Sequence, residues 1–280
     1  MAHTPINGVR RFCVLDLKEN FRARWYQAYT IGIASIIGLF FFFGLAESQV
    51  LGFTGLGRLL LAFLQVCLVL VPVFVLITTA RSMVGDRESG VWEYELSFPV
   101  NLKAYFWGRA LGRLFSVLLP LWGGLLGASV LSLVIYQSLP WQQVLLYAML
   151  IFALVAFFLG LGLWISMRSA QQEIAIGMGF LAWLVFSLLI DALLLGLLLK
   201  ERIFEDGLVW LALLNPMQGF RTASLALFDP DLTVLGPIAY TLTEKVGTNQ
   251  LMIWSCLWPL LLGYLFCRLA LRRFQKEDLL

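Results

Sequence analysis

Long apolar stretches alternate with short charged segments along this chain. Six of the stretches hold at most one ionised side chain, and each is close to the ~20 residues that an α-helix needs to cross ~30 Å of hydrocarbon. The pattern therefore predicts six transmembrane helices. They are expected at Tyr26–Ala46, Leu59–Ala80, Leu114–Tyr136, Gln143–Met167, Ile176–Leu199 and Leu251–Cys267.

The composition supports lipid as the solvent of most of the chain. Of the 280 residues, 60% are hydrophobic and only 13% are charged, about half the charged fraction of a typical globular protein. We therefore expect an all-α integral membrane protein that forms a single transmembrane domain over residues 1–280. Because several charged side chains of both signs precede the first apolar run, we expect no cleaved signal peptide.

The positions of the basic residues predict the orientation of the chain. Fifteen of the twenty Lys and Arg residues lie in the two terminal segments, in the loop 81–113 and at Arg168. Basic residues favour the cytoplasmic side of short loops. Both termini and the loop 81–113 are therefore expected in the cytoplasm, and the segment 200–250 outside it. Since the basic clusters adjoin membrane spans, we expect contact with membrane lipid and no nucleic-acid partner.

The segment 1–25, which precedes the first span, has an amphipathic pattern. Its apolar side chains recur on one helical face between residues 9 and 25, with most of the charged ones on the other. We expect an interfacial helix, which serves either as an anchor or as a lever that follows movement of the bundle. The apolar face comprises Cys13, Val14, Leu17, Phe21 and Trp25.

The cytoplasmic loop 81–113 mixes dense charge with large aromatic side chains. A solvated loop has little use for such aromatics, whereas a short helix that docks into a partner's groove uses apolar anchors with a polar rim. Both interpretations are open from the residues alone. Asn101 is a candidate N-cap for a helix that continues from Leu102 into the third span. The candidate docking residues are Asp86, Arg87, Glu88, Gly90, Trp92, Glu93 and Tyr94.

The outer segment 200–250 is more apolar than a solvated connection requires. Residues Trp210–Leu214 and Phe220–Phe228 flank Asn215 and Pro216, a pair typical of a turn. The segment either re-enters the outer leaflet or packs flat on the outer face, because re-entrant backbone needs cover from protein or water. Asn215, Pro216 and Arg221 are candidates for a pathway or gate.

Asp191 is the one acidic residue within a predicted span. An ionisable group in the membrane is costly and usually faces protein or water. Asp191 therefore either lines a substrate route or gate, or is a structural hydrogen-bonding partner near the wetter end of its helix.

Other chemistry has little support in the sequence. The four cysteines form no CxxC pair, the methionines do not cluster, and the single histidine is His3. The chain has no GxxxxGK[ST] phosphate loop, which ATPases of the P-loop class require. We therefore expect no metal or cofactor on this chain, no ATPase site and no enzymatic activity of its own.

Two segments resemble the permeases of ABC-2-type ATP-binding-cassette transporters. In the cytoplasmic loop, Arg87-Glu88-Ser89-Gly90, Glu93, Leu96 and Pro99 match the family's pattern, although Glu95 stands where a leucine is usual. In the outer segment, Leu213-Leu214-Asn215-Pro216, Arg221 and the run 222–228 are similar to permeases of the transporter that matures nitrous oxide reductase.

The resemblance implies an ABC-2 permease fold in the bacterial inner membrane. It implies that the loop 81–113 is a coupling helix that contacts a separate ATPase subunit, which holds ATP and Mg²⁺. It also implies a second permease copy, most simply a homodimer, and a periplasmic accessory protein in the assembly of a copper enzyme.

Three other functions agree with the sequence. The first is an ABC-2 exporter of a lipid, a glycan or a hydrophobic drug. The second is an ion-coupled carrier that acts alone with Asp191 as its proton site. The third is a mechanical scaffold that transmits ATPase motion to a periplasmic partner without moving a solute.

Overall fold

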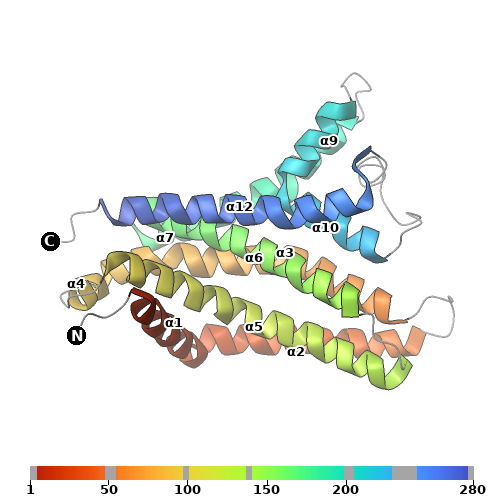
Figure 1. Ribbon diagram of the computed structural model, residues 1–280, viewed down its shortest axis with the longest axis horizontal. Helices are drawn as coiled ribbons and strands as arrows, with labels where there is room; N and C mark the ends of the chain where they lie inside the picture. The colour runs from red at the N-terminus through yellow and green to blue at the C-terminus, as the bar shows by residue number, and fades with distance from the viewer. Residues whose placement is uncertain are drawn as a thin grey trace.

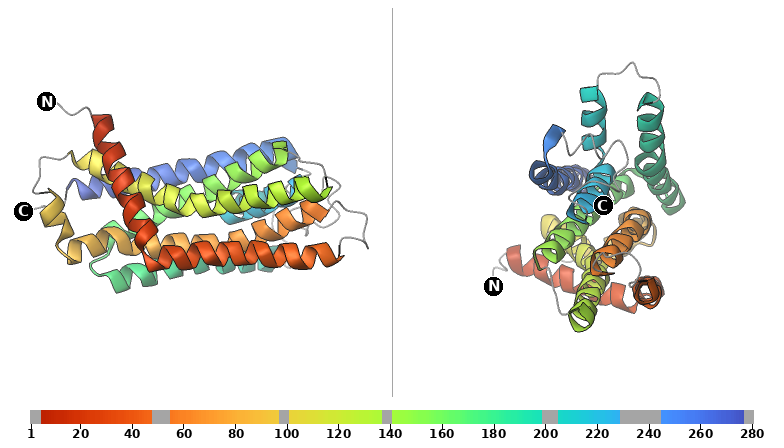
Figure 2. Two further views of the ribbon diagram at one scale, coloured as in Figure 1. Left: turned by 90° about the horizontal axis from the view of Figure 1, so that it is seen from below. Right: turned by 90° about the vertical axis from the view of Figure 1, so that its right-hand side faces the viewer.

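The computed structural model describes residues 5–47, 55–96, 101–136, 141–198, 205–228 and 245–276. Every regular element in these ranges is helical. The long helices run side by side in an elongated bundle (Figure 1). The start of α1 and the end of α12 lie together at one end, which also carries α4 (Figures 1 and 2). We call this the near end and the opposite end, toward α9 and α10, the far end.

Twelve helical elements follow one another in the described ranges. They are α1 (Pro5–Arg22), α2 (Arg24–Glu47), α3 (Gly55–Glu88), α4 (Val91–Leu96), α5 (Leu102–Tyr136), α6 (Trp141–Arg168), α7 (Gln172–Leu184), the π-helical turn η1 (Val185–Leu189), α8 (Ile190–Leu198), α9 (Glu205–Leu214), α10 (Pro216–Phe228) and α12 (Thr248–Phe274).

Five stretches of helix in the described chain are long and apolar enough to cross a membrane. They are Phe63–Glu88, Leu102–Val130, Trp141–Arg168, Gln172–Leu194 and Thr248–Phe274. They correspond to the second to sixth predicted spans, which confirms an all-helical membrane protein. The first predicted span lies within α2, a helix of 24 residues. The total of six spans stays a prediction.

Helix α6 lies at the centre of the bundle and packs against α3, α5, α7, α10 and α12. Its crossing with α12 depends on two glycines. A Cβ atom added at Gly160 would meet the carbonyl oxygen of Gly263, and one added at Gly263 would meet the carbonyl oxygen of Ala156. Small residues at such crossings let two membrane helices approach closely, and dispersion contacts then hold them together.

The N-terminal segment is helical but differs in detail from the prediction. Helix α1 ends at Arg22 and α2 begins at Arg24, so Trp25 belongs to the next helix and not to the predicted face. The face of α1 that packs on α5 carries buried Asp16 and Asn20, whereas Val14 and Phe21 are exposed. The periodicity did not predict the two polar side chains that pack α1 onto α5. The interfacial position of α1 stays a prediction.

The predicted loop 81–113 is largely helical. Helix α3 continues past the predicted span to Glu88, and α5 begins at Leu102, with Asn101 Oδ1 accepting the Lys103 amide hydrogen bond at 2.9 Å, as expected for an N-cap. Short α4 lies between them at the near end (Figure 1). Pro99 of the predicted motif lies outside the described residues.

Candidate functional site

The near-end site is built around the turn between α3 and α4. Gly90 adopts φ = 72°, a left-handed conformation that glycine adopts without the steric penalty of a side chain. Its amide donates to the carbonyl of Arg87 at 3.2 Å, and its own carbonyl accepts from the amide of Tyr94 at 3.3 Å. The glycine therefore ends α3, as is common after a helix C-terminus, and starts α4 in a new direction.

Two side chains of the turn tie α3 to the connection between α6 and α7. The Arg87 guanidinium donates to the carbonyl of Ser169 at 2.6 Å, and the Glu88 carboxylate accepts from the amide of Gln172 at 3.3 Å. Trp92 of α4 is only 4% exposed and meets the ring of Phe274 edge-on, with 5.0 Å between ring centroids. The end of α3 is therefore fixed against the connection between α6 and α7, and α4 against the end of α12.

The seven predicted docking residues therefore divide into two groups. Four are partly or fully buried: Asp86, Arg87, Gly90 and Trp92. The other three are exposed, namely Glu88, Glu93 and Tyr94, Tyr94 by 71%, although Glu88 also accepts the hydrogen bond from Gln172. The aromatic anchor that faces outward is thus Tyr94, and Trp92 packs α4 onto the bundle. Contact of these residues with another subunit stays a prediction.

Sequence reasoning missed a charged cluster directly behind α4. Arg109 of α5 is 8% exposed and donates to both carboxylate oxygens of Glu95 in α4 at 3.0 Å. It also donates to Glu19 of α1 at 2.9 Å, and it lies 3.5 Å from Asp16 and 4.0 Å from Asp86. One guanidinium thus joins α1, the end of α3, α4 and α5. We call these five residues the Arg109 cluster.

A second set of contacts holds α1 onto α5. Asn20 donates to Asp16 at 2.7 Å and to the Ser116 hydroxyl at 3.1 Å, and a Cβ atom at Gly112 would collide with Asp16. Burial, with the nearby Asp16 carboxylate, raises the pKa of the Cys13 thiol, which therefore stays protonated. The helix period alone could have indicated this polar face, since Asp16 and Asn20 stand four residues apart.

At the far end the structure pairs two of the four predicted pathway residues, Asp191 and Arg221. Asp191 of α8 accepts hydrogen bonds from Gln218 at 2.7 Å and from Arg221 at 3.2 Å, both on α10. Asp191 is 29% exposed and Arg221 is 47% exposed. The carboxylate is thus satisfied by two partners, as expected for an ionisable group within a membrane protein. Sequence analysis had not singled out Gln218.

Asn215 forms the joint between α9 and α10, with Pro216 as the first residue of α10, where proline is favoured. Asn215 is 1% exposed. Its side chain accepts the Met217 amide hydrogen bond at 3.0 Å and donates to the carbonyl of Phe186 in η1 at 2.9 Å. A π-helical turn interrupts the regular helix pattern, and such turns are frequent at functional sites. Asn215 thus caps the start of α10 and provides a hydrogen-bond donor for a backbone carbonyl of η1.

Two tryptophans of α12 hold α9 in place. The indole nitrogens of Trp254 and Trp258 donate to the carbonyls of Leu213 and Leu214 at 3.0 and 3.1 Å. The predicted turn between two apolar segments is therefore present as two helices joined at a buried asparagine. Their depth in a membrane stays a prediction.

The described chain is a bundle of membrane-spanning helices, with an exposed short helix at one end and a helical hairpin at the other. These features define a multi-pass membrane protein with no soluble domain in its described part. The chain belongs to the ABC-2 family of transporter proteins, whose family model matches residues 15–279. It is thus a permease subunit of an ABC transporter, and the family implies an ABC ATPase as its partner.

Two curated relatives cover nearly the whole chain. A probable ABC transporter permease protein NosY of Stutzerimonas stutzeri is 26% identical over 278 residues, which is 94% of this chain and 99% of the relative. A protein of the same name from Pseudomonas aeruginosa is 28% identical over 255 residues, which is 87% of this chain and 90% of the relative. Both support a permease of bacterial type.

Proposed function

We propose that this permease docks its ATPase subunit through an exposed surface formed by Glu93 and Tyr94 of α4 and by Glu88 at the end of α3, and that the docking couples ATP hydrolysis to movement of the bundle. The observation that supports this is the attachment of α4. It is a separate short helix, exposed on one face and bound on the other by the Arg109 cluster and by Trp92.

The Arg109 cluster supports a mechanical route from α4 into the bundle. A force on α4 acts on Glu95, and Arg109 passes it to α5 directly and to α1 through Glu19. Because interior groups are closely packed, a helix moves as a unit and not by local deformation. We infer that α1 and α5 shift together when the ATPase subunits close.

Such a shift of α1 and α5 would change the positions of the helices at the far end. Helix α10 packs on α3, α6 and α12. Its Gln218 and Arg221 donate hydrogen bonds to Asp191 next to the π-helical turn. The ion pair favours a positioning role for Asp191 over a proton site. The likeness to NosY permeases supports a role of this end in contacting a periplasmic accessory protein during maturation of a copper enzyme, with a second permease copy beside this one.

The alternative is an ABC-2 exporter of a lipid, a glycan or a drug, which shares the same ATPase coupling. The two are separated by what stimulates ATP hydrolysis in the reconstituted complex. Stimulation by a hydrophobic solute would favour the exporter, and stimulation by an accessory protein without a solute would favour the maturation role.

The docking face is tested by co-purification of the full chain with its ABC ATPase subunit from solubilised membranes. Glu93→Lys and Tyr94→Ala are compared with Tyr264→Ala, since Tyr264 is also an exposed tyrosine, at 54%, but lies on α12. Loss of the ATPase in the two α4 variants alone is the expected result. Full retention in both α4 variants, with ATPase bound to the wild type, would contradict docking through α4.

A further inference from the structure

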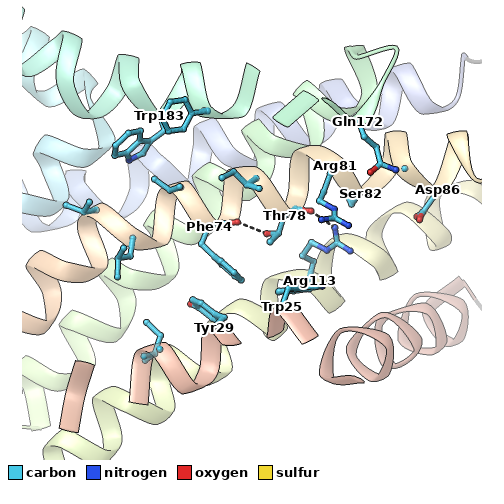
Figure 3. A pocket seen from close by; sticks show the side chains of 18 of the residues that line it. Trp25, Tyr29, Phe74, Thr78, Arg81, Ser82, Asp86, Arg113, Gln172 and Trp183 are labelled. Atoms are coloured by element: carbon cyan, nitrogen blue, oxygen red, sulfur yellow. Dashed lines mark hydrogen bonds between the residues drawn. The ribbon is translucent and has the colours of Figure 1, made fainter. Parts of the chain in front are cut away.

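A groove runs along the outside of the bundle between α2 and α7, with α3 as its floor. It encloses about 910 Å³, within the ~300–1,000 Å³ of typical small-molecule sites. Toward the far end it is lined by apolar and aromatic side chains, and toward the near end by polar and basic ones. Figure 3 shows Trp183 on one side of the groove and Tyr29 and Phe74 on the other.

The near-end part of the groove holds two arginines that face each other. The guanidinium groups of Arg81 and Arg113 converge in Figure 3, from α3 and α5. Arg81 is exposed and has no hydrogen bond or ion pair to any residue that the structure describes. Arg113 is 15% exposed, lies 3.7 Å from Asp16 and donates to the carbonyl of Thr78 at 3.0 Å. Its Nε is buried without a hydrogen-bond partner among the described residues.

The Asp16 carboxylate compensates part of the charge of Arg113, whereas Arg81 pairs with no acidic residue in the described part of the chain. Planar guanidinium groups suit phosphate oxygens, so an anion beside Arg81 and Arg113 would be favoured. Ser82 and Gln172 line the same part of the groove and offer further polar contacts to such a group. Asp86 also lines it but faces Arg109 at 4.0 Å. The polar part of the groove is therefore complementary to one anionic headgroup.

The apolar part has the length of one membrane leaflet. From Arg81 to Val69 on α3 the chain rises through 12 helical residues, about 18 Å at 1.5 Å each, against about 15 Å for half of a ~30 Å hydrocarbon core. Val69, Leu70 and Phe180 along this part are between 44% and 50% exposed. Exposed apolar surface of this kind is stable only when lipid or protein covers it.

We propose that this groove binds an anionic phospholipid of the near-end leaflet, with its phosphate between Arg81 and Arg113 and an acyl chain along α3 toward Val69. The site is independent of the ATPase-docking face. It sits where α2, α3, α5 and α7 meet, so a bound lipid would stabilise their relative positions.

The probe is phosphatidylglycerol, with phosphatidylcholine as the lipid that lacks net charge. The full chain is purified in detergent, and retained lipid is counted by native mass spectrometry during titration with each lipid. Arg81→Gln removes one guanidinium that the fold does not use, and Arg272→Gln is the matched control, an exposed arginine at the end of α12. Val73→Phe fills the groove without changing charge.

We expect Arg81→Gln to weaken phosphatidylglycerol binding about fivefold, since one basic residue near a membrane surface contributes about 1 kcal/mol toward anionic lipid. Phosphatidylcholine binding should be unchanged by Arg81→Gln, and Val73→Phe should weaken binding of both lipids. Arg272→Gln should behave as wild type.

Three results would overturn the proposal. One is equal phosphatidylglycerol affinity in wild type and Arg81→Gln. Another is competition by inorganic phosphate at concentrations equal to those of the lipid, which would indicate a soluble anion. The third is rapid disulfide formation between two copies carrying Val69→Cys with no change in retained lipid, which would indicate that a second copy covers the groove.

Discussion

Replacing Arg109 by methionine removes the guanidinium but keeps an unbranched side chain of similar length. Three hydrogen bonds disappear, two to Glu95 and one to Glu19. Four carboxylates then remain close together, those of Asp16, Asp86, Glu19 and Glu95. Arg113, 3.7 Å from Asp16, is still available as a basic neighbour. The variant therefore leaves carboxylates without their shared partner.

The size of the effect follows from the burial of the cluster. Arg109 is 8% exposed and Asp16 is 1% exposed, but Glu19 is 49% exposed and is screened by solvent. Breaking a buried ion pair by removing one partner costs about 3–5 kcal/mol. We expect about 3 kcal/mol for Arg109→Met because part of the cluster is wet, and about 1–2 kcal/mol for Glu95→Gln, whose amide still accepts a hydrogen bond.

The assay combines unfolding of the chain in mixed micelles with amide hydrogen exchange resolved by segment. Arg168→Met is the control, because Arg168 lies at the same end and stacks on Trp164 at 5.0 Å outside the cluster. A loss of about 3 kcal/mol corresponds to exchange roughly a hundredfold faster, and it should be confined to α1 and α4. Equal stability of Arg109→Met and Arg168→Met, with unchanged exchange in α4, would refute the reasoning.

Three further predictions concern the helix crossing and the far end. Gly160→Leu should lower the free energy of unfolding by about 3 kcal/mol or more, since the new side chain meets the α12 backbone. The control Gly123→Leu has open space around it and should change the free energy of unfolding by less than about 0.5 kcal/mol. Chemical unfolding in micelles measures both. Asn215→Ala should cost about 2 kcal/mol through the lost cap and the unpaired carbonyl of η1, and exchange in α10 should rise; unchanged exchange would contradict its role as a joint. Asp191→Asn should keep the Gln218 contact but lose the ion pair with Arg221, so reconstituted ATP-driven activity should persist; complete loss with a folded chain would instead favour a proton site.

The positions of the spans along the sequence could be predicted because membrane crossing depends on local composition. A run of about 20 apolar residues predicts a helix without any knowledge of its neighbours, and five of the predicted spans appear as such in the described chain. The cap at Asn101 and the turn at Asn215 were also predicted, since both depend on residues close in sequence. The end of α3 at Glu88 was harder to predict, because the apolar run of the span stops before it and Gly90 is the local signal for the turn.

The contacts that make the site depend on pairs far apart in sequence. Arg109 meets Glu19 ninety positions away, and no local pattern specifies that pairing. Glu95 departs from the family's usual leucine, and the structure supplies its reason in the two hydrogen bonds to Arg109. Trp92 is chemically suited to a partner's groove or to the chain's own core, and only the position of Phe274 decides between them.

Docking of the ATPase on α4 is tested most directly by placing a photo-crosslinking amino acid at position 94 of the full chain in intact membranes that contain its ABC ATPase subunit. Position 264 on α12 is the control. The account predicts a crosslinked product of the chain with the ATPase at position 94 and little at position 264. Equal crosslinking at both positions, or crosslinking at 264 alone, would contradict it.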